Sequence, residues 1–200
     1  MVYAVIKRLF DIIGSGLGLL LIAPFFPFIA LAIKIESSGP VLVKLARVSS
    51  GRIIEVYKFR SMVRGARYLK PMLVSFNERA NSPFFKIKND PRLTKVGKFL
   101  RKFRLDEFPQ LINVLKGELA LVGPRPHEPE EVIHYPHPYK HLLLAKAGVT
   151  GLSQVSGASS LLFLKELAFD DYYLKNQSIW FDMKIILKTL AILFFDPTAV

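Results

Sequence analysis

The sequence predicts a mainly helical α+β protein with an N-terminal membrane helix broken at proline, a small β-hairpin and amphipathic helices at a membrane interface. Three observations support this. Residues 12–33 carry no charge but contain two prolines. Two β-prone runs, residues 41–48 and 53–59, are joined through Ser49-Ser50-Gly51. Apolar residues between 94 and 104 recur at the spacing of a helix.

The composition indicates phosphate-rich partners and a membrane surface. There are 28 Lys and Arg against 16 Asp and Glu, a formal charge of +12, and 51% of the residues are hydrophobic. The charge favours nucleic acid, anionic lipid or nucleotide-type ligands, and the apolar share favours lipid among these. The absence of cysteine excludes disulfides, thiolate metal sites and a cysteine nucleophile, and it fits a cytosolic location.

The first element is the uncharged run, which is long enough to cross a bilayer. Lys7 and Arg8 precede it and Lys34 follows it, so the positive-inside rule holds both ends on the cytosolic side. Pro24 and Pro27 disfavour a straight helix. Residues 1–36 are therefore a membrane anchor, and the residues alone leave re-entrant and spanning geometries open. The absence of an A-x-A site argues against a cleaved signal peptide.

Residues 37–200 are predicted to form a domain at the membrane surface. It begins with a break at residues 37–40 and the hairpin, while residues 61–85 carry mixed signals and stay unassigned. Residues 94–104 form a basic amphipathic helix, either with a solvated face or lying among lipid headgroups. Near the end, Ile179–Phe195 suits packing on the membrane surface, with Trp180 at the boundary.

Two adjacent acids, Asp106 and Glu107, stand just before a short helix, residues 110–115, that follows Pro109 and closes at Gly117. Such acids often only cap a helix. In a basic region, however, one carboxylate can hold Mg²⁺ while the other attacks phosphorus. We expect the helix dipole to keep Asp106 ionised, with a low pKa.

Further cations are candidates to bind phosphate. Arg125 lies between Pro124 and Pro126, where a guanidinium group can clamp a phosphate. Weaker candidates are Arg92, Lys58 and Arg60. A metal site among the histidines of residues 127–141 is disfavoured because prolines interrupt the ligand spacing, and the chain has neither a G-x-S-x-G elbow nor a P-loop.

These motifs resemble the bacterial sugar transferases, the monotopic polyprenyl-phosphate phosphoglycosyl transferases. The resemblance runs through nearly all of the chain: KRLFDIIGSGLGLLLIAPFF, GPVLVKLARV, VYKFRSM, NDPRLTKVGKFLRKFRLDEFPQLINVLKGELALVGPRP, AGVTGLSQVSG and DDYYLKNQSIWFDMKIILKT. The chain looks like the minimal catalytic form, without the additional multi-helix membrane domain of larger relatives.

The resemblance implies a reaction. A nucleotide diphosphate sugar, with UDP the expected nucleotide, gives its sugar-1-phosphate to undecaprenyl or another polyprenol phosphate and releases UMP. Asp106 would be the nucleophile that forms a phosphosugar-aspartyl intermediate, Glu107 would place Mg²⁺, and Arg125 would contact phosphate. Pro24 would break a re-entrant helix. The enzyme would begin glycan assembly at the cytosolic face of the bacterial inner membrane.

Four positions depart from the family pattern: Ala23, Leu45, Ala147 and Ala158. They leave the acid pair and the Pro-Arg-Pro motif intact, so they bear on substrate preference and the helix break. We expect membrane lipids and a second copy of the chain as further partners, and no nucleic acid. A competing hypothesis is a non-enzymatic basic module that binds nucleic acid or anionic lipid; it leaves the acid pair unexplained.

Overall fold

The computed structural model describes residues 2–79, 82–157 and 160–195. Ala158, one of the departures from the family pattern, lies outside the described residues. The described chain is mainly helical with a two-stranded hairpin and a second, very short strand pair, which confirms the predicted fold class.

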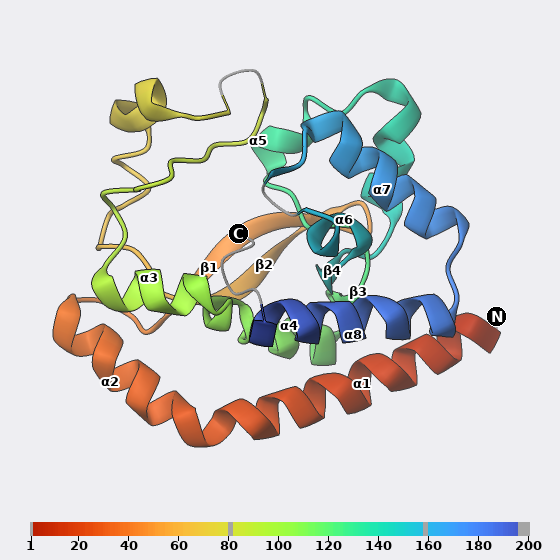
Figure 1. The fold of residues 1–200 in the computed structure, drawn as a ribbon, viewed down its shortest axis with the longest axis horizontal. Coiled ribbons are helices and arrows are strands. Elements are labelled where there is room, and N and C mark those ends of the chain that lie inside the picture. The colour runs from red at the N-terminus through yellow and green to blue at the C-terminus, as the bar shows by residue number, and fades with distance from the viewer. Residues whose placement is uncertain (1, 80–81, 158–159, 196–200) are drawn as a thin grey trace.

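The N-terminal segment forms two helices that meet in a wide V at the base of the molecule (Figure 1). Helix α1 (Val2–Ile22) runs into a 3₁₀ turn, η1 (Ala23–Phe25), which is followed by α2 (Phe26–Glu36). Pro24 and Pro27 have no N–H to give to the preceding turn, so the helix bends there. Both ends of the V point toward the rest of the protein.

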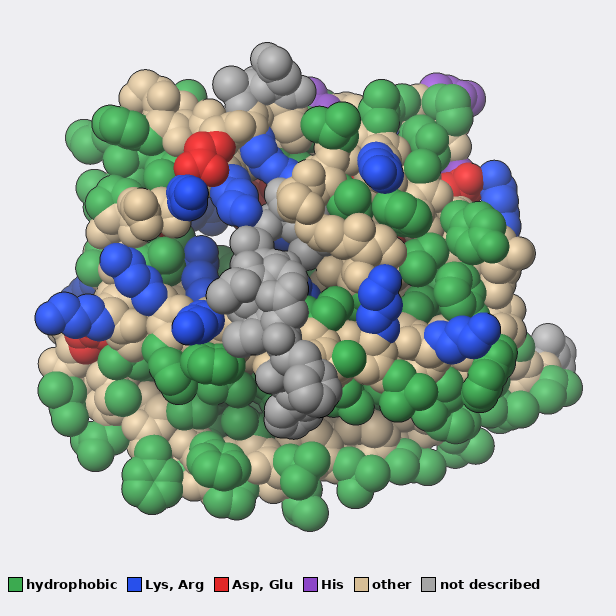
Figure 2. Space-filling model, in the orientation of Figure 1, with side chains coloured by type: hydrophobic (Ala, Val, Ile, Leu, Met, Phe, Trp, Pro, Cys, Tyr) green, Lys and Arg blue, Asp and Glu red, His purple; other side chains and the backbone are tan. Residues whose placement is uncertain are grey.

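The outer face of this V is apolar and exposed. Val2–Glu36 is long and apolar enough to cross a membrane, and very little of its most apolar stretch is buried within the protein. Figure 2 shows the resulting row of hydrophobic side chains along the lower edge. Its most exposed members are Val2, Val5, Ile13, Leu17, Leu20, Leu21, Phe25, Phe28, Leu31 and Ile35.

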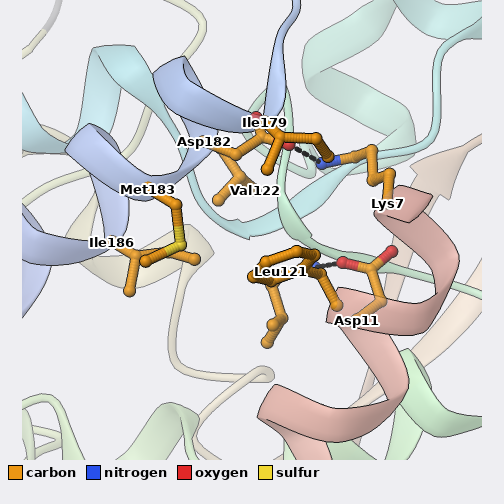
Figure 3. A pocket seen from close by; sticks show the side chains of 9 residues that line it. Lys7, Asp11, Leu121, Val122, Ile179, Asp182, Met183 and Ile186 are labelled. Atoms are coloured by element: carbon orange, nitrogen blue, oxygen red, sulfur yellow. Dashed lines mark hydrogen bonds and ion pairs between the residues drawn. The ribbon is translucent and has the colours of Figure 1, made fainter. Parts of the chain in front are cut away.

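Polar contacts fasten α1 to the domain. Arg8 donates from Nη1 to Val114 O at 2.7 Å and from Nη2 to Leu115 O at 2.8 Å, at the C-terminal end of α4 (Gln110–Lys116). Cations are favoured at such helix ends. Lys7 pairs with Asp182 of α8 (Ile179–Phe195) at 2.8 Å, beside a small, mostly apolar pocket between the two helices (Figure 3).

The hairpin pairs β1 (Leu42–Ser49) with β2 (Arg52–Phe59) in antiparallel register, as predicted. Ser50 and Gly51 form the connection with φ values of 52° and 71°, the two positive angles of a type I′ turn. The outer edge of β2 pairs with a side chain: Tyr57 N–H donates to Asn113 Oδ1, and Asn113 Nδ2 donates to Glu55 O. Asn113 is fully buried in α4.

After the hairpin, the previously unassigned region consists of turns and a 3₁₀ segment, η2 (Pro71–Phe76). The predicted basic helix is α3 (Lys95–Lys102), capped by Thr94, whose Oγ1 accepts from Gly97 N. It ends two residues earlier than predicted because Arg104 adopts a left-handed conformation, with φ of 52°. A 3₁₀ turn, η3 (Leu105–Glu107), then leads to α4.

The C-terminal half supplies a parallel pair of short strands, β3 (Ala120–Val122) and β4 (Gly148–Thr150). A Cβ at Gly148 would overlap the backbone of Gly123, so this close approach requires glycine. Helix α8 and α7 (Phe163–Lys175) pack on the pair through Val122, Tyr173 and Ile185. The remaining elements are α5 (Pro129–Val132), η4 (His137–Leu144) and α6 (Leu152–Val155).

Candidate active site

The adjacent acids lie in η3, at the turn between α3 and α4. Arg104, directly before η3, is one of two described non-glycine residues with positive φ. This left-handed residue reverses the chain after α3. The turn buries Asp106, which is 5% exposed, and leaves the side chain of Glu107 30% exposed. Asp106 therefore faces the interior while Glu107 is reachable from outside.

Lys58, at the end of β2, reaches both acids. Its Nζ lies 2.5 Å from Glu107 Oε1 and 4.0 Å from Asp106 Oδ2. The strand and η3 are thus joined by an ion pair between residues 49 positions apart in the chain. Of the three weaker phosphate candidates, Lys58 is the one that forms ion pairs with the acid pair in the described structure.

The pKa values of the two acids shift in opposite directions. Burial raises the pKa of Asp106, Lys58 partly opposes this, and the negative charge of Glu107 adds to the rise. Burial also acts on Glu107, but Lys58, Arg125 and Arg104 outweigh it and lower the pKa of Glu107 to about 2. The expectation of a low pKa for Asp106 is wrong, because burial exceeds any effect of the short helix that follows.

Arg125 lies in the loop after β3 and is within electrostatic range of the acid pair, since its charge lowers the pKa of Glu107. Its backbone N–H donates to Asp170 Oδ2 at 3.0 Å, and its Nε lies 3.6 Å from Glu166 Oε1. Both acids belong to α7. Two carboxylates of α7 therefore contact Arg125 in the Pro-Arg-Pro loop, while 39% of the Arg125 side chain remains exposed.

The structure engages Arg92 and Arg60 in other contacts. Arg92 is 6% exposed and pairs with Asp90, with Nη2 at 2.6 Å from Oδ2. Arg60 donates from Nη2 to Ser37 O at 2.6 Å, just beyond the end of α2. Phosphate binding by these two residues stays a prediction. The Arg92 pair is local, with Asp90 two residues away, whereas the Arg60 contact joins the end of β2 to the segment after α2.

Sequence reasoning missed Glu166, Asp170 and the partner of Glu166, His127. His127 Nε2 lies 2.9 Å from Glu166 Oε1, and all three side chains are buried. A signal was present: two acids four residues apart share one face of α7 with the apolar Leu167 and Tyr173. Acids on the apolar face of a helix are rare unless they have partners.

The acid pair fits Mg²⁺ by its chemistry. Within the described residues no three His, Cys, Asp or Glu side chains form a group that could hold a metal. Mg²⁺, however, is commonly bound through one or two carboxylates together with substrate phosphates. Glu107, partly exposed and ionised, supplies such an oxygen ligand, with Asp106 beside it.

The surroundings of the acid pair are basic. Figure 2 shows Lys and Arg side chains gathered around a hollow above α3, next to the segment that leads from the hairpin to that helix. Lys58, Arg101, Arg104 and Arg125 each act electrostatically on one or both acids. The pocket in Figure 3 is a separate site, lined by residues of α1, β3 and α8, and neither Asp106 nor Glu107 lines it.

Nearly the whole chain matches one protein family. The model of the family described as "Bacterial sugar transferase" matches residues 2–196. The chain belongs to this family. Its members similar to the chain include the undecaprenyl-phosphate galactose phosphotransferase of Salmonella typhimurium, 39% identical over 191 residues, which are 94% of this chain and 40% of that protein.

Two further family members show the range of lengths. The UDP-glucose:undecaprenyl-phosphate glucose-1-phosphate transferase of Escherichia coli is 40% identical over 194 residues, covering 92% of this chain and 39% of that protein. The exopolysaccharide production protein ExoY of Rhizobium meliloti is 35% identical, covering 92% of this chain and 83% of that protein. The chain thus spans about two fifths of the first curated relatives it matches.

Two of the described departures from the family pattern, Leu45 and Ala147, lie in the packed core, whereas Ala23 is exposed. Ala23 opens η1, Leu45 packs on the core around Ile54, and Ala147 is 3% exposed, with its carbonyl accepting from Ala120 N. Among the described residues, none of the three shares a core cluster or a hydrogen bond with Asp106 or Glu107.

Proposed function

We propose that the chain is a polyprenyl-phosphate sugar-1-phosphate transferase. The observation that carries the proposal is the buried Asp106 beside an ionised Glu107, with Lys58 and Arg125 around them. Family membership and the names of the relatives support the same reaction class. The donor would be a UDP-sugar and the acceptor undecaprenyl phosphate or another polyprenol phosphate.

The proposed reaction has two displacements at one phosphorus. A carboxylate oxygen of Asp106 attacks the sugar-bearing phosphorus of the UDP-sugar, and the bond to the bridging oxygen breaks, so that UMP leaves with the electron pair. The phosphosugar is then an acyl phosphate on Asp106. An oxygen of polyprenol phosphate attacks the same phosphorus and the Asp106 carboxylate leaves, which yields a polyprenyl diphosphate sugar.

The residues around Asp106 have separate tasks in this proposal. Lys58 stabilises the two neighbouring carboxylates, and Arg125 contacts a phosphate with its exposed guanidinium group. Glu107, assisted by Asp106, would hold Mg²⁺. The metal, when bound, neutralises charge on the diphosphate. Burial of Asp106 limits access of water to the acyl phosphate.

The anchor explains how a lipid substrate could reach the site. In the proposed topology the V of α1 and α2 is re-entrant at the cytosolic face of the bacterial inner membrane, and the domain of residues 37–200 lies on that face among the headgroups. The bend at Pro24 supports this. Single cysteines at Val2 and Ser38 should be labelled from the same side, and labelling from opposite sides would contradict the topology.

Replacement of Asp106 by Asn tests the mechanism. The wild-type protein, given Mg²⁺ and a panel of UDP-sugars without acceptor, should gain the mass of a sugar phosphate, and adding polyprenol phosphate should release UMP continuously. Asp106→Asn should lose both, by a factor of about 10³ or more. Asp171→Asn, in an exposed pair with Lys175, is the control that should stay active. Full turnover by Asp106→Asn would refute the mechanism.

A further inference from the structure

Two carboxylates of α7 converge on a single residue of the Pro-Arg-Pro loop. Glu166 and Asp170 are four residues apart, so they lie on one face of the helix, and each is 1% exposed. We propose that they are positioning residues that orient Arg125 toward the acid pair. The inference rests on the proposed function, in which Arg125 contacts a substrate phosphate.

The two acids act on different parts of Arg125. Asp170 Oδ2 accepts the backbone N–H of Arg125 at 3.0 Å, which orients the main chain of the loop. Glu166 Oε1 lies 3.6 Å from Nε, the guanidinium nitrogen nearest the backbone. With one contact at each end of the aliphatic stem, the side chain loses much of its rotational freedom before a substrate binds. Part of the guanidinium group stays exposed for a ligand.

Glu166 is kept charged by the groups behind it. The Glu166 carboxylate can only accept, so the ring proton of His127 is assigned to Nε2, which lies 2.9 Å from Glu166 Oε1. Nδ1 of the neutral ring then accepts from Tyr135 O–H at 2.7 Å. Burial raises the pKa of Glu166, but His127 and Arg125 outweigh it and the pKa is lowered. A buried carboxylate that served packing alone would be replaceable by an apolar side chain. Here its charge faces Arg125.

A double-mutant cycle separates positioning from mere structural support. Glu166→Gln keeps the shape and removes the charge, so we expect kcat/KM with the UDP-sugar to fall roughly tenfold to a hundredfold. In an Arg125→Ala background, Glu166→Gln should alter kcat/KM less than about threefold, because the guanidinium group that Glu166 orients is no longer present. Glu166→Asp, which retains the charge, should recover part of the loss.

Asp170 provides an independent arm if Glu166→Gln does not fold. Asp170→Asn retains an oxygen that can accept the Arg125 N–H and should stay within about threefold of wild type, whereas Asp170→Ala should lose roughly tenfold. Thermal unfolding of each variant identifies those that fold. Equal losses from Glu166→Gln in both backgrounds, or equal activities of Asp170→Asn and Asp170→Ala, would overturn the inference.

The failure of the proposed function would look different. If Arg125→Ala is fully active, Arg125 has no role in the reaction and the positioning inference falls with it. If Arg125→Ala is impaired but the Glu166 effect is additive, the positioning inference alone is wrong. The trapping experiment on Asp106 is unaffected by either result, because it reports the nucleophile directly.

Discussion

Replacement of Gly97 by Ala should disturb both the fold and the site. Gly97 lies in α3 where the helix crosses the chain after β2. A Cβ at this position would overlap Ser61 O and would lie 2.5 Å from the carbonyl carbon and 2.7 Å from Cα of Ser61. Carbon atoms in good contact are about 3.5–4.0 Å apart. The obstacle is backbone, so the helix and the strand end must separate by roughly 1 Å.

The expected magnitudes follow from this displacement. Overpacking of this kind lowers the free energy of unfolding by about 1–3 kcal/mol. The higher helix propensity of alanine raises it by about 1 kcal/mol. With rigid backbone as the obstacle, we expect a net loss of about 2 kcal/mol, a fall of roughly 4–8 °C in the unfolding midpoint. Ser61 is three residues after Lys58, and α3 leads into η3. The ion pair from Lys58 to Glu107 should therefore be misplaced, and turnover should fall about a hundredfold.

Thermal unfolding and UMP release from a UDP-sugar with polyprenol phosphate measure these effects. Gly16→Ala is the matched control, because Gly16 is also helical and a Cβ there would meet nothing within 4 Å. It should unfold at or slightly above the wild-type temperature and keep its activity. A Gly97→Ala protein with the stability and turnover of the Gly16→Ala protein would refute the assigned contact between α3 and Ser61.

Two further predictions concern buried polar groups. Asn113→Ala leaves Tyr57 N–H and Glu55 O unpaired on the outer edge of β2 and should lower the free energy of unfolding by about 3 kcal/mol in urea titrations; a loss below about 0.5 kcal/mol would contradict this. Burial raises the pKa of Asp170 to about 6, above its ordinary value of 3.8. Because the folded-state pKa is the higher one, the contribution of Asp170 to stability is present below pH 4 and is lost as the pH rises through 6, by up to about 3 kcal/mol. Asp170→Asn should remove that dependence. Between pH 4 and 6.5 the free energy of unfolding of wild type should therefore fall relative to that of Asp170→Asn. Parallel curves for the two proteins would contradict the raised pKa of Asp170.

The anchor bend, the hairpin and α3 were predictable because each depends on residues close together in the chain. Two prolines in an apolar run bend a helix wherever the run is placed, and a Ser-Gly pair between β-prone runs favours a tight hairpin. The period of α3 is likewise contained in its own residues. Residues 61–85 lacked any such period, and the structure gives them turns and a short 3₁₀ segment.

The partners of the candidate site were not predictable in this way. The neighbours of Asp106 and Glu107 along the chain do not identify Lys58, which is brought to them by the packing of β2 on η3. The reason for glycine at position 97 lies in Ser61, and the acids that hold Arg125 come from α7, more than 40 residues later. None of these pairs leaves a periodic trace in the sequence.

The sequence by itself therefore determined the hairpin, the helices α3 and α4, the bend of the anchor and the chemical identity of the acid pair and the Pro-Arg-Pro motif. These depend on backbone sterics and on side-chain periodicity over a few residues. The tertiary structure decided which charges meet and in which direction the pKa of each acid shifts. The pKa of Asp106 rises because the fold removes it from water, and burial is a property of the packed chain that no local pattern contains.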